Sequence, residues 1–392
     1  MTLLLIVIYT AFIGLGVPDS LIGSAWPAIY SDLNLPVDAV SIITLLISGS
    51  TVLSSIFSAR ILTKLGTPIV TALSTALTAA ALIGFSFAPN IYWMLPLAVG
   101  LGLGAGAIDA GLNNYVALHL GARQMNFLHC FYGVGVTVSP YIMSIALDSA
   151  GWRAGYRCAA IIQITITVII ILSIRLWKKD TPGEAEEEVS QKNLSLIGML
   201  KTPGLVAAWI IMIATNAIEY AAGVWGGTYL VNHHLFSAGD AAAAISLYYA
   251  GLAVGRLLSG LISGKVKTWA RIGAGTVTVL CAVVILSLPL PSAFAVVGLA
   301  LVGFGNGSIY PNFIHLTPHN FGKEVSQSVM GSLIAFAYIG VMLAPPLVGL
   351  ITGGFGMKSY PFILAAFLLI MIAATAVFIV QLKKQKKFDT TV

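Results

Sequence analysis

The chain has 392 residues, of which 58% are hydrophobic and only 9% are charged, and its formal net charge is +6. Because soluble domains carry about 25% charged residues, this composition excludes a soluble globular protein and indicates one that crosses a membrane several times. The apolar runs are about 20 residues long, which suits transmembrane helices rather than barrel strands. The three cysteines lie in apolar segments without paired spacing, which argues against a disulfide framework or a metal site.

Short segments rich in Pro, Gly and Asn divide the chain into twelve expected membrane-spanning helices. These cover residues 3–25, 39–60, 67–88, 91–119, 124–147, 154–177, 204–230, 240–263, 269–289, 291–316, 324–351 and 358–381. The longest polar stretch separates the first six helices from the last six and is typical of a solvated linker. The sequence therefore predicts an all-α membrane protein, with an N-terminal six-helix bundle over 1–177, a cytoplasmic linker over 178–201, and a C-terminal six-helix bundle with a short basic tail over 202–392.

Basic residues are distributed unevenly between the two faces of the expected membrane domain. If both termini lie on one side, that side receives sixteen Lys and Arg, and the other receives only Arg153, Arg157 and Lys358. The positive-inside rule then predicts that both termini and the linker are cytoplasmic, in a cell inner membrane or plasma membrane. The basic tail over 383–387 is typical of an anchor to the lipid bilayer and does not indicate nucleic-acid binding.

The segment over 101–119 introduces polar groups into an otherwise apolar helix. Gly102, Gly106, Asp109 and Asn113 are three or four residues apart, so they share one helix face. Glycines allow a second helix to approach closely. A carboxylate at bilayer depth costs about 2.5–3.5 kcal/mol unless it faces a protein interior or water. The pattern predicts a protonatable site inside the protein, although Asp109 as a purely structural hydrogen-bonding group is the alternative.

Four ionisable residues lie deep in the expected spans and are the candidates for proton or ion coupling: Asp19, Asp109, Glu219 and Arg256. Glu219 and Arg256 are expected to form an interhelical pair, which is either structural or functional. Asp19 and Asp109 have no cation nearby in the sequence, and burial without a cation favours the protonated form of a carboxyl group. We therefore expect at least one of these two aspartates to carry a proton across the membrane. Pro18 precedes Asp19 and weakens local helix hydrogen bonding, which leaves backbone groups for a substrate or an ion.

The two halves of the sequence repeat one another about 200 residues apart. The matched segments are 102–109 with 303–310, 135–140 with 340–345, and 59–66 with 260–267. A six-helix unit used twice is the plan of transporters whose halves move about a central site.

The segment over 59–66 resembles the loop signature of the major facilitator superfamily, with Lys64 and Gly66 kept and with Ala59 and Thr63 in place of its first glycine and its acid. The resemblance extends over the whole chain. It implies twelve transmembrane helices in two pseudo-symmetric six-helix bundles and secondary active transport.

Within that superfamily the chain resembles the fucose:proton symporter-like sugar permeases and their sodium-dependent relatives. Asp19 and Asp109 are similar to the two carboxylates of fucose permease, although the second is glutamate there. The segments 125–135, 219–229 and 255–260 resemble spans five, seven and eight of that group. The resemblance implies a monosaccharide substrate.

A sugar needs amides and carboxylates for its hydroxyl groups and aromatic faces for its C–H surfaces. The candidate substrate-binding residues are Asn113, Asn126, His129, Gln163, Asn216, Trp225, Tyr229, Asn306, Tyr310, Asn312 and Trp26. Each has a structural alternative, because a lone Asn can join two helices and a Trp near a span end can belong to the interfacial aromatic belt.

The sequence therefore predicts a secondary active transporter that imports a small polar solute, a monosaccharide, by proton-coupled alternating access. A proton-coupled drug or metabolite exporter of the same fold, a sodium-coupled sugar symporter, and a nutrient sensor without flux remain alternatives. No nucleotide-binding motif, nucleophile–base arrangement or metal-ligand set occurs, so we expect neither an enzyme nor a cofactor. The expected partners are the solute, a proton or sodium ion and the lipid bilayer, and the expected state is a monomer.

Overall fold

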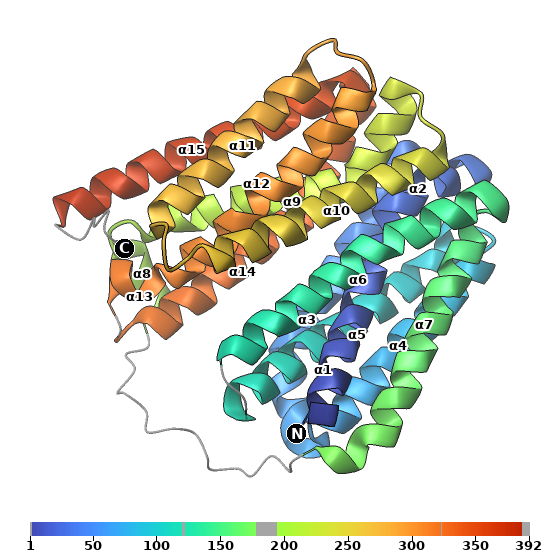
Figure 1. Cartoon of the computed structure of the whole chain (residues 1–392), viewed down its shortest axis with the longest axis horizontal. Coiled ribbons are helices and arrows are strands. Elements are labelled where there is room, and N and C mark those ends of the chain that lie inside the picture. The colour runs from blue at the N-terminus through green and yellow to red at the C-terminus, as the bar shows by residue number, and fades with distance from the viewer. Residues whose placement is uncertain (1, 120–121, 178–193, 323, 386–392) are drawn as a thin grey trace. The chain divides into compact units, whose positions relative to one another are not determined.

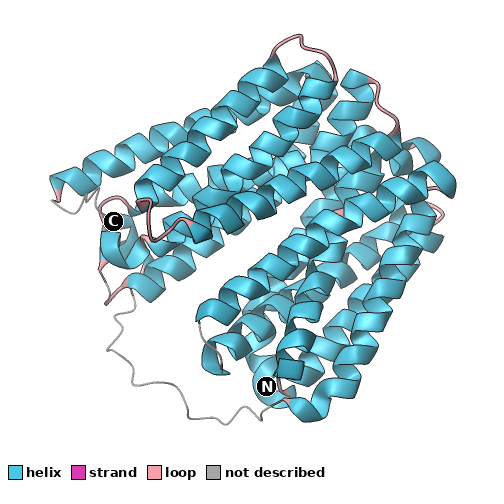
Figure 2. Ribbon diagram, viewed as in Figure 1, coloured by secondary structure: helices cyan, strands magenta, loops and turns pink. Residues whose placement is uncertain are grey.

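The computed structural model describes residues 2–119, 122–177, 194–322 and 324–385. Over these residues the protein consists of helices joined by short loops, without strands (Figure 2). Within the same residues, twelve helical segments are long and apolar enough to cross a membrane. The predicted all-α, multi-pass architecture is confirmed.

The first six spans are built from nine helical segments, several of them paired (Figure 1). They are α1 (Thr2–Asp19) with α2 (Leu21–Asp32), η1 (Val37–Ala39) with α3 (Val40–Leu65), α4 (Thr67–Phe87), α5 (Ile91–His119), α6 (Ala122–Ser149), and α7 (Trp152–Ser173) with η2 (Ile174–Leu176). Gly66 and Gly151 separate consecutive helices with φ angles of 78° and 81°, a left-handed conformation that costs glycine little.

The last six spans follow a short helix, α8 (Leu196–Lys201). They are α9 (Leu205–His234), α10 (Ala238–Leu261), α11 (Thr268–Ser287), α12 (Ala293–His315) followed by α13 (Thr317–Phe321), α14 (Ser326–Phe355), and η3 (Met357–Ser359) with α15 (Tyr360–Lys384). The first span differs most from its predicted range. It continues to Asp32 instead of ending at residue 25, because apolar residues follow the interruption at Ser20 and α2 accommodates Pro27 within it.

The chain divides into two compact units, and α9 and α10 contribute to both. Unit 1 comprises Met1–Ala185 and Gly226–Tyr249, and unit 2 comprises Glu186–Trp225 and Ala250–Val392. Most of the linker expected over 178–201 lies outside the described residues, so the division of the chain at that linker stays a prediction.

In unit 1, α5 packs between α3 and α4, α4 also packs on α7, and α1 lies along α6. Buried side chains of α1, α5, α6 and α7, among them Phe12, Ile108 and Tyr115, form its apolar core. Gly102 and Gly106 face backbone carbonyls of α3, so a side chain at either position would collide with α3. The close helix approach predicted at these glycines is confirmed.

In unit 2, α11 packs on α12 and α15. One contact between a glycine and a backbone carbonyl occurs at matching positions in both units. Gly340 of α14 lies against the carbonyl of Ile213 in α9, as Gly135 of α6 lies against the carbonyl of Ile13 in α1. Ile13 and Ile213 are 200 positions apart in the chain. The internal repeat predicted from the sequence is therefore supported by matching helix contacts.

Candidate functional site

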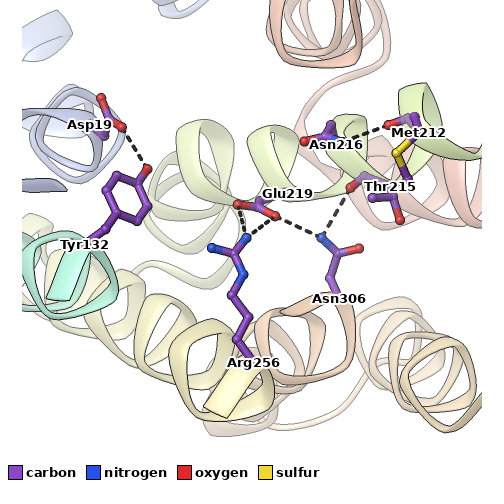
Figure 3. Close-up of polar contacts among 8 residues, drawn as sticks. All are labelled: Asp19, Tyr132, Met212, Thr215, Asn216, Glu219, Arg256 and Asn306. Atoms are coloured by element: carbon purple, nitrogen blue, oxygen red, sulfur yellow. Dashed lines mark hydrogen bonds and ion pairs between the residues drawn. The ribbon is translucent and has the colours of Figure 1, made fainter. Parts of the chain in front are cut away.

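Asp19 lies where the first membrane span is interrupted. It is the last residue of α1, Ser20 separates it from α2, and Pro18 has no N–H to continue the helix. The Tyr132 hydroxyl of α6 donates a hydrogen bond of 2.8 Å to Asp19 Oδ2 (Figure 3). Asp19 is therefore half-buried at a helix break and is bonded by a neutral group from a neighbouring helix.

Asp109 is bonded within its own helix. Asn113 Nδ2 donates to Asp109 Oδ1 at 2.8 Å and to the Asp109 carbonyl at 2.9 Å. Asp109 is half-buried. Two ion pairs occur among the described residues, Arg153–Asp32 and Arg256–Glu219, so neither Asp19 nor Asp109 takes part in one there.

Unit 2 holds its acid differently. Arg256 of α10 donates from one guanidinium nitrogen to both carboxylate oxygens of Glu219 in α9, each at 3.1 Å (Figure 3). Asn306 Nδ2 of α12 adds a third contact to Glu219 at 3.3 Å. The interhelical pair predicted from the sequence is confirmed, and it joins three helices through one carboxylate.

One amide contacts this ion pair, and a second lies on the helix that carries Glu219. The Asn306 side chain is fully buried, and its Nδ2 also lies 3.3 Å from the carbonyl of Thr215, one turn before Glu219. Asn216 is half-buried and donates to the carbonyl of Met212 at 2.9 Å. The structure therefore brings three of the predicted site residues into contact, Glu219, Arg256 and Asn306, and Asn216 lies one turn before Glu219 on the same helix.

Five other predicted substrate contacts lie in the interior and bond to protein groups. These are Trp26 with the Val37 carbonyl, Gln163 with Thr78, Trp225 with the Pro345 carbonyl, Tyr229 with His234, and Asn312 with Ser259. Trp26 and Trp225 are 0% exposed, so a substrate reaches them only if their surroundings open. Tyr310 is half-buried, His129 is exposed with its ring edge against Phe12, and the side chain of Asn126 lies outside the described part of the structure.

Tyr132 is a site residue that sequence reasoning did not single out. It lies three residues before Gly135, the glycine through which α6 meets α1. The position of Tyr132 one turn before Gly135 places it on the side of α6 that faces α1, where Asp19 lies. This pattern in the sequence could have identified Tyr132.

A twelve-helix membrane domain with a repeated packing unit and with acids at the depth of its spans has the features of a secondary transporter. The sequence model of the Major Facilitator Superfamily matches residues 6–334. The chain belongs to this family of membrane transporters, and it is not an enzyme.

Two curated proteins are similar to parts of the chain. The niacin transporter NiaP of Acinetobacter baylyi is 28% identical over 123 residues, which are 30% of this chain and 28% of NiaP. A probable hexose phosphate transport protein of Chlamydia muridarum is 25% identical over 165 residues, 36% of each chain. The chain thus matches about a third or less of the length of these relatives.

Solved structures match over nearly the whole chain. A mutant of the nucleoside transporter NupG superposes with a TM-score of 0.75 at 10% identity, covering 96% of this chain and 98% of NupG. A bacterial homolog of the human lysosomal transporter Spinster, in an inward-facing and occupied conformation, gives 0.70 at 15% identity, covering 99% and 97%. At these identities the likeness shows the fold alone.

Proposed function

We propose that this transporter imports a small polar solute, a monosaccharide, together with protons, and that at least one of Asp19 and Asp109 carries the proton. The observation that supports the proposal most directly is that the described contacts of both carboxyl groups come from neutral donors, Tyr132 and Asn113. A carboxylate held by an arginine stays ionised, whereas one held by neutral donors can gain and lose a proton.

The Tyr132 hydroxyl can hydrogen-bond Asp19 in both its ionised and its protonated form. A phenolic hydroxyl donates to a carboxylate, and it accepts from a carboxylic acid after rotation of its own proton. Asp19 therefore keeps a hydrogen bond to α6 whether or not it is protonated. The break between α1 and α2 gives the two half-helices freedom to adjust to that change.

We propose that the amides around Glu219 and Arg256 contact the solute. Asn216 and Asn306 offer amide groups to sugar hydroxyls, and the ion pair offers an acceptor and a donor within the same cluster. Asn113, His129 and Tyr310 are further proposed contacts. The names of the two curated relatives, which refer to niacin and hexose phosphate, support a small polar metabolite rather than a hydrophobic drug.

The proposed topology has both termini and the linker in the cytoplasm of a cell inner or plasma membrane, with one six-helix bundle before the linker and one after it. The uneven distribution of Lys and Arg supports this orientation. On this topology the ends of α2, α6 and α9 at Asp32, Ser149 and His234 face outward.

Flux measurements on purified protein in liposomes test the proposal. Solutes are first selected by the thermal stabilisation they give, because a bound solute raises the population of the folded state. Gradient-driven accumulation and solute counterflow are then compared for wild type, Asp19→Asn, Asp109→Asn and the double variant. We expect the double variant to keep counterflow and to lose accumulation under a pH gradient.

Asp38→Asn is the matched control, because it makes the same chemical change at an exposed position of η1. Accumulation by the double variant at the wild-type level would contradict the proton role. Accumulation driven by a sodium gradient alone would select the sodium-coupled alternative, and stabilisation only by hydrophobic cations would select the exporter.

A further inference from the structure

The short helix α8 is attached to unit 2 at the level where membrane spans begin. The backbone N–H of Leu194, just before α8, donates to Ser328 Oγ at 3.2 Å, and Ser328 is the first residue of the span formed by α14. The span of α9 begins at Leu205, four residues after α8 ends at Lys201. We propose that α8 and the C-terminal end of α15 together bind anionic phospholipids of the cytoplasmic leaflet. The inference rests on the proposed topology, which places these helix ends in the cytoplasm.

The turn between α8 and α9 packs against the last turns of α15. Gln385 Nε2 donates to the carbonyl of Pro203 at 3.4 Å. The next residue, Gly204, has a φ angle of 90°, and its Cβ position lies 3.0 Å from the ring of Phe378 in α15. A larger residue would strain the backbone there and crowd the ring. The end of α8 and the end of α15 are therefore held together.

This contact gathers positive charge at one place. Lys201 is exposed and lies two residues before Pro203, and Lys383 and Lys384 are exposed and directly precede Gln385. Lys384 is also the last residue of its membrane span. Lysines at this depth lie next to the lipid headgroups, where an anionic leaflet attracts them.

The side chains of α8 supply an apolar face beside these charges. Four of its six residues are Leu, Ile or Met, and Ile197 and Leu200 are 67% and 55% exposed. They are three residues apart, so they lie on the same side of the helix. Ser195 caps α8 by accepting from the Gly198 N–H at 3.2 Å, but a helix this short is unstable in water without further burial. The boundary between headgroups and acyl chains provides that burial.

The combination of charge and apolar surface favours a phospholipid over other occupants. A free phosphate ion would interact with the lysines and leave Ile197 and Leu200 in water. An apolar protein segment would cover those two side chains and leave the lysines without an anion. An anionic phospholipid offers a phosphate and acyl chains to both parts of the surface at once.

A fluorescent probe measures whether α8 enters the leaflet. The variant Ile197→Cys, with the three native cysteines replaced by serine, is labelled with the environment-sensitive dye NBD and placed in lipid nanodiscs. The control is Gly264→Cys, an exposed position in the loop after α10 with no atom within 4 Å of its Cβ position. We expect the emission at position 197 to shift to the blue and to be quenched by lipids that carry a nitroxide near the headgroup, whereas the emission at 264 stays that of a dye in water.

Emission typical of water at position 197 would overturn the inference. A blue shift that the nitroxide lipids do not quench would also overturn it, because α8 would then be covered by protein.

A second measurement tests the lysines with a matched pair of double variants. Lys383→Gln with Lys384→Gln is compared with Lys265→Gln with Lys267→Gln, which removes the same charge from exposed positions of the α10–α11 loop. The thermal midpoint of each purified protein is followed in detergent while phosphatidylglycerol, phosphatidylcholine or inorganic phosphate is added. A lysine near an anionic lipid surface contributes about fivefold in affinity, so the first double variant should need about 25-fold more phosphatidylglycerol for half of the stabilisation. The second should behave like wild type.

Equal losses in the two double variants would refute the site, since any positive charge would then serve. Equal stabilisation by inorganic phosphate and by phosphatidylglycerol would refute the lipid as the ligand. Neither measurement depends on solute flux, so a failure of the transport proposal and a failure of the lipid surface are seen separately.

Discussion

Asp19 and Glu219 occupy corresponding places in the two units, yet the protein holds them in opposite ways. Each follows, by the same number of residues, an isoleucine whose carbonyl packs on a glycine of another helix, Gly135 or Gly340. Asp19 receives a phenolic hydroxyl, whereas Glu219 receives an arginine and an amide. The two units therefore share the helix–helix backbone contact, but the groups that bond the carboxylate differ between them.

We propose that this difference gives the two units separate tasks. A carboxylate bonded to an arginine on a neighbouring helix is held in one position, which suits a fixed recognition site. A carboxylate bonded by a hydroxyl or an amide can change its protonation without leaving a buried cation unpaired. We therefore expect substitutions in unit 2 to affect stability and solute affinity, and those in unit 1 to affect coupling.

The largest expected effect comes from breaking the ion pair of unit 2. Arg256→Met removes the cation and leaves Glu219 charged among apolar helices, at a cost of about 3 kcal/mol in the free energy of unfolding. The midpoint of unfolding of purified protein, followed by tryptophan fluorescence, should fall markedly. Adding Glu219→Gln should restore most of the loss, because the remaining pair of side chains is neutral.

Asp32 and Arg153 provide the matched control for this prediction. They form the other ion pair among the described residues, with side chains 47% and 35% exposed. An exposed pair contributes about 0–1 kcal/mol, so Asp32→Asn should shift the midpoint little. Equal shifts of the unfolding midpoint in Arg256→Met and Asp32→Asn would contradict the prediction, because they would mean that burial of the Glu219–Arg256 pair adds nothing to its effect on stability.

The second expected effect concerns what the units share. Gly135→Ala and Gly340→Ala each place a methyl group against a backbone carbonyl, and overpacking of this kind costs about 1–3 kcal/mol. Both variants should lower the unfolding midpoint by similar amounts. Gly331→Ala, in the same helix as Gly340 but with no atom within 4 Å of its Cβ position, should be neutral or stabilising. A loss confined to one unit would contradict the repeated packing.

The sequence predicted most of the scaffold for identifiable reasons. Long apolar runs predict membrane spans, and the glycines spaced along 102–109 predict a close helix contact. Isolated charges such as Glu219 and Arg256 are expected to pair, because an unpaired charge at bilayer depth is too unfavourable.

Contacts made through carbonyls and hydroxyls were not predictable. Tyr132 reaches Asp19, and Asp148 reaches Gly239, only because helices distant in the sequence are adjacent in the fold. Trp26 and Trp225 looked like sugar platforms by residue type, but their indole N–H groups bond to backbone carbonyls inside unit 1 and unit 2, respectively.

The smallest expected effect is also the most specific to unit 1. Tyr132→Phe removes one hydroxyl and its 2.8 Å hydrogen bond to Asp19, while the ring keeps its packing. The coupling step should slow because Asp19 loses its bond to α6, and the free energy of unfolding should fall by no more than the about 1.5–3 kcal/mol that a hydrogen bond to a charged group contributes. The measurement compares pH-driven accumulation with counterflow, and only accumulation should fall.

Tyr141→Phe changes an exposed tyrosine on the same helix. It is the control and should leave both rates unchanged. If Tyr132→Phe lowers counterflow and accumulation equally, the hydroxyl orders the helix break instead of serving the proton, and Asp109 becomes the stronger candidate for the carrier.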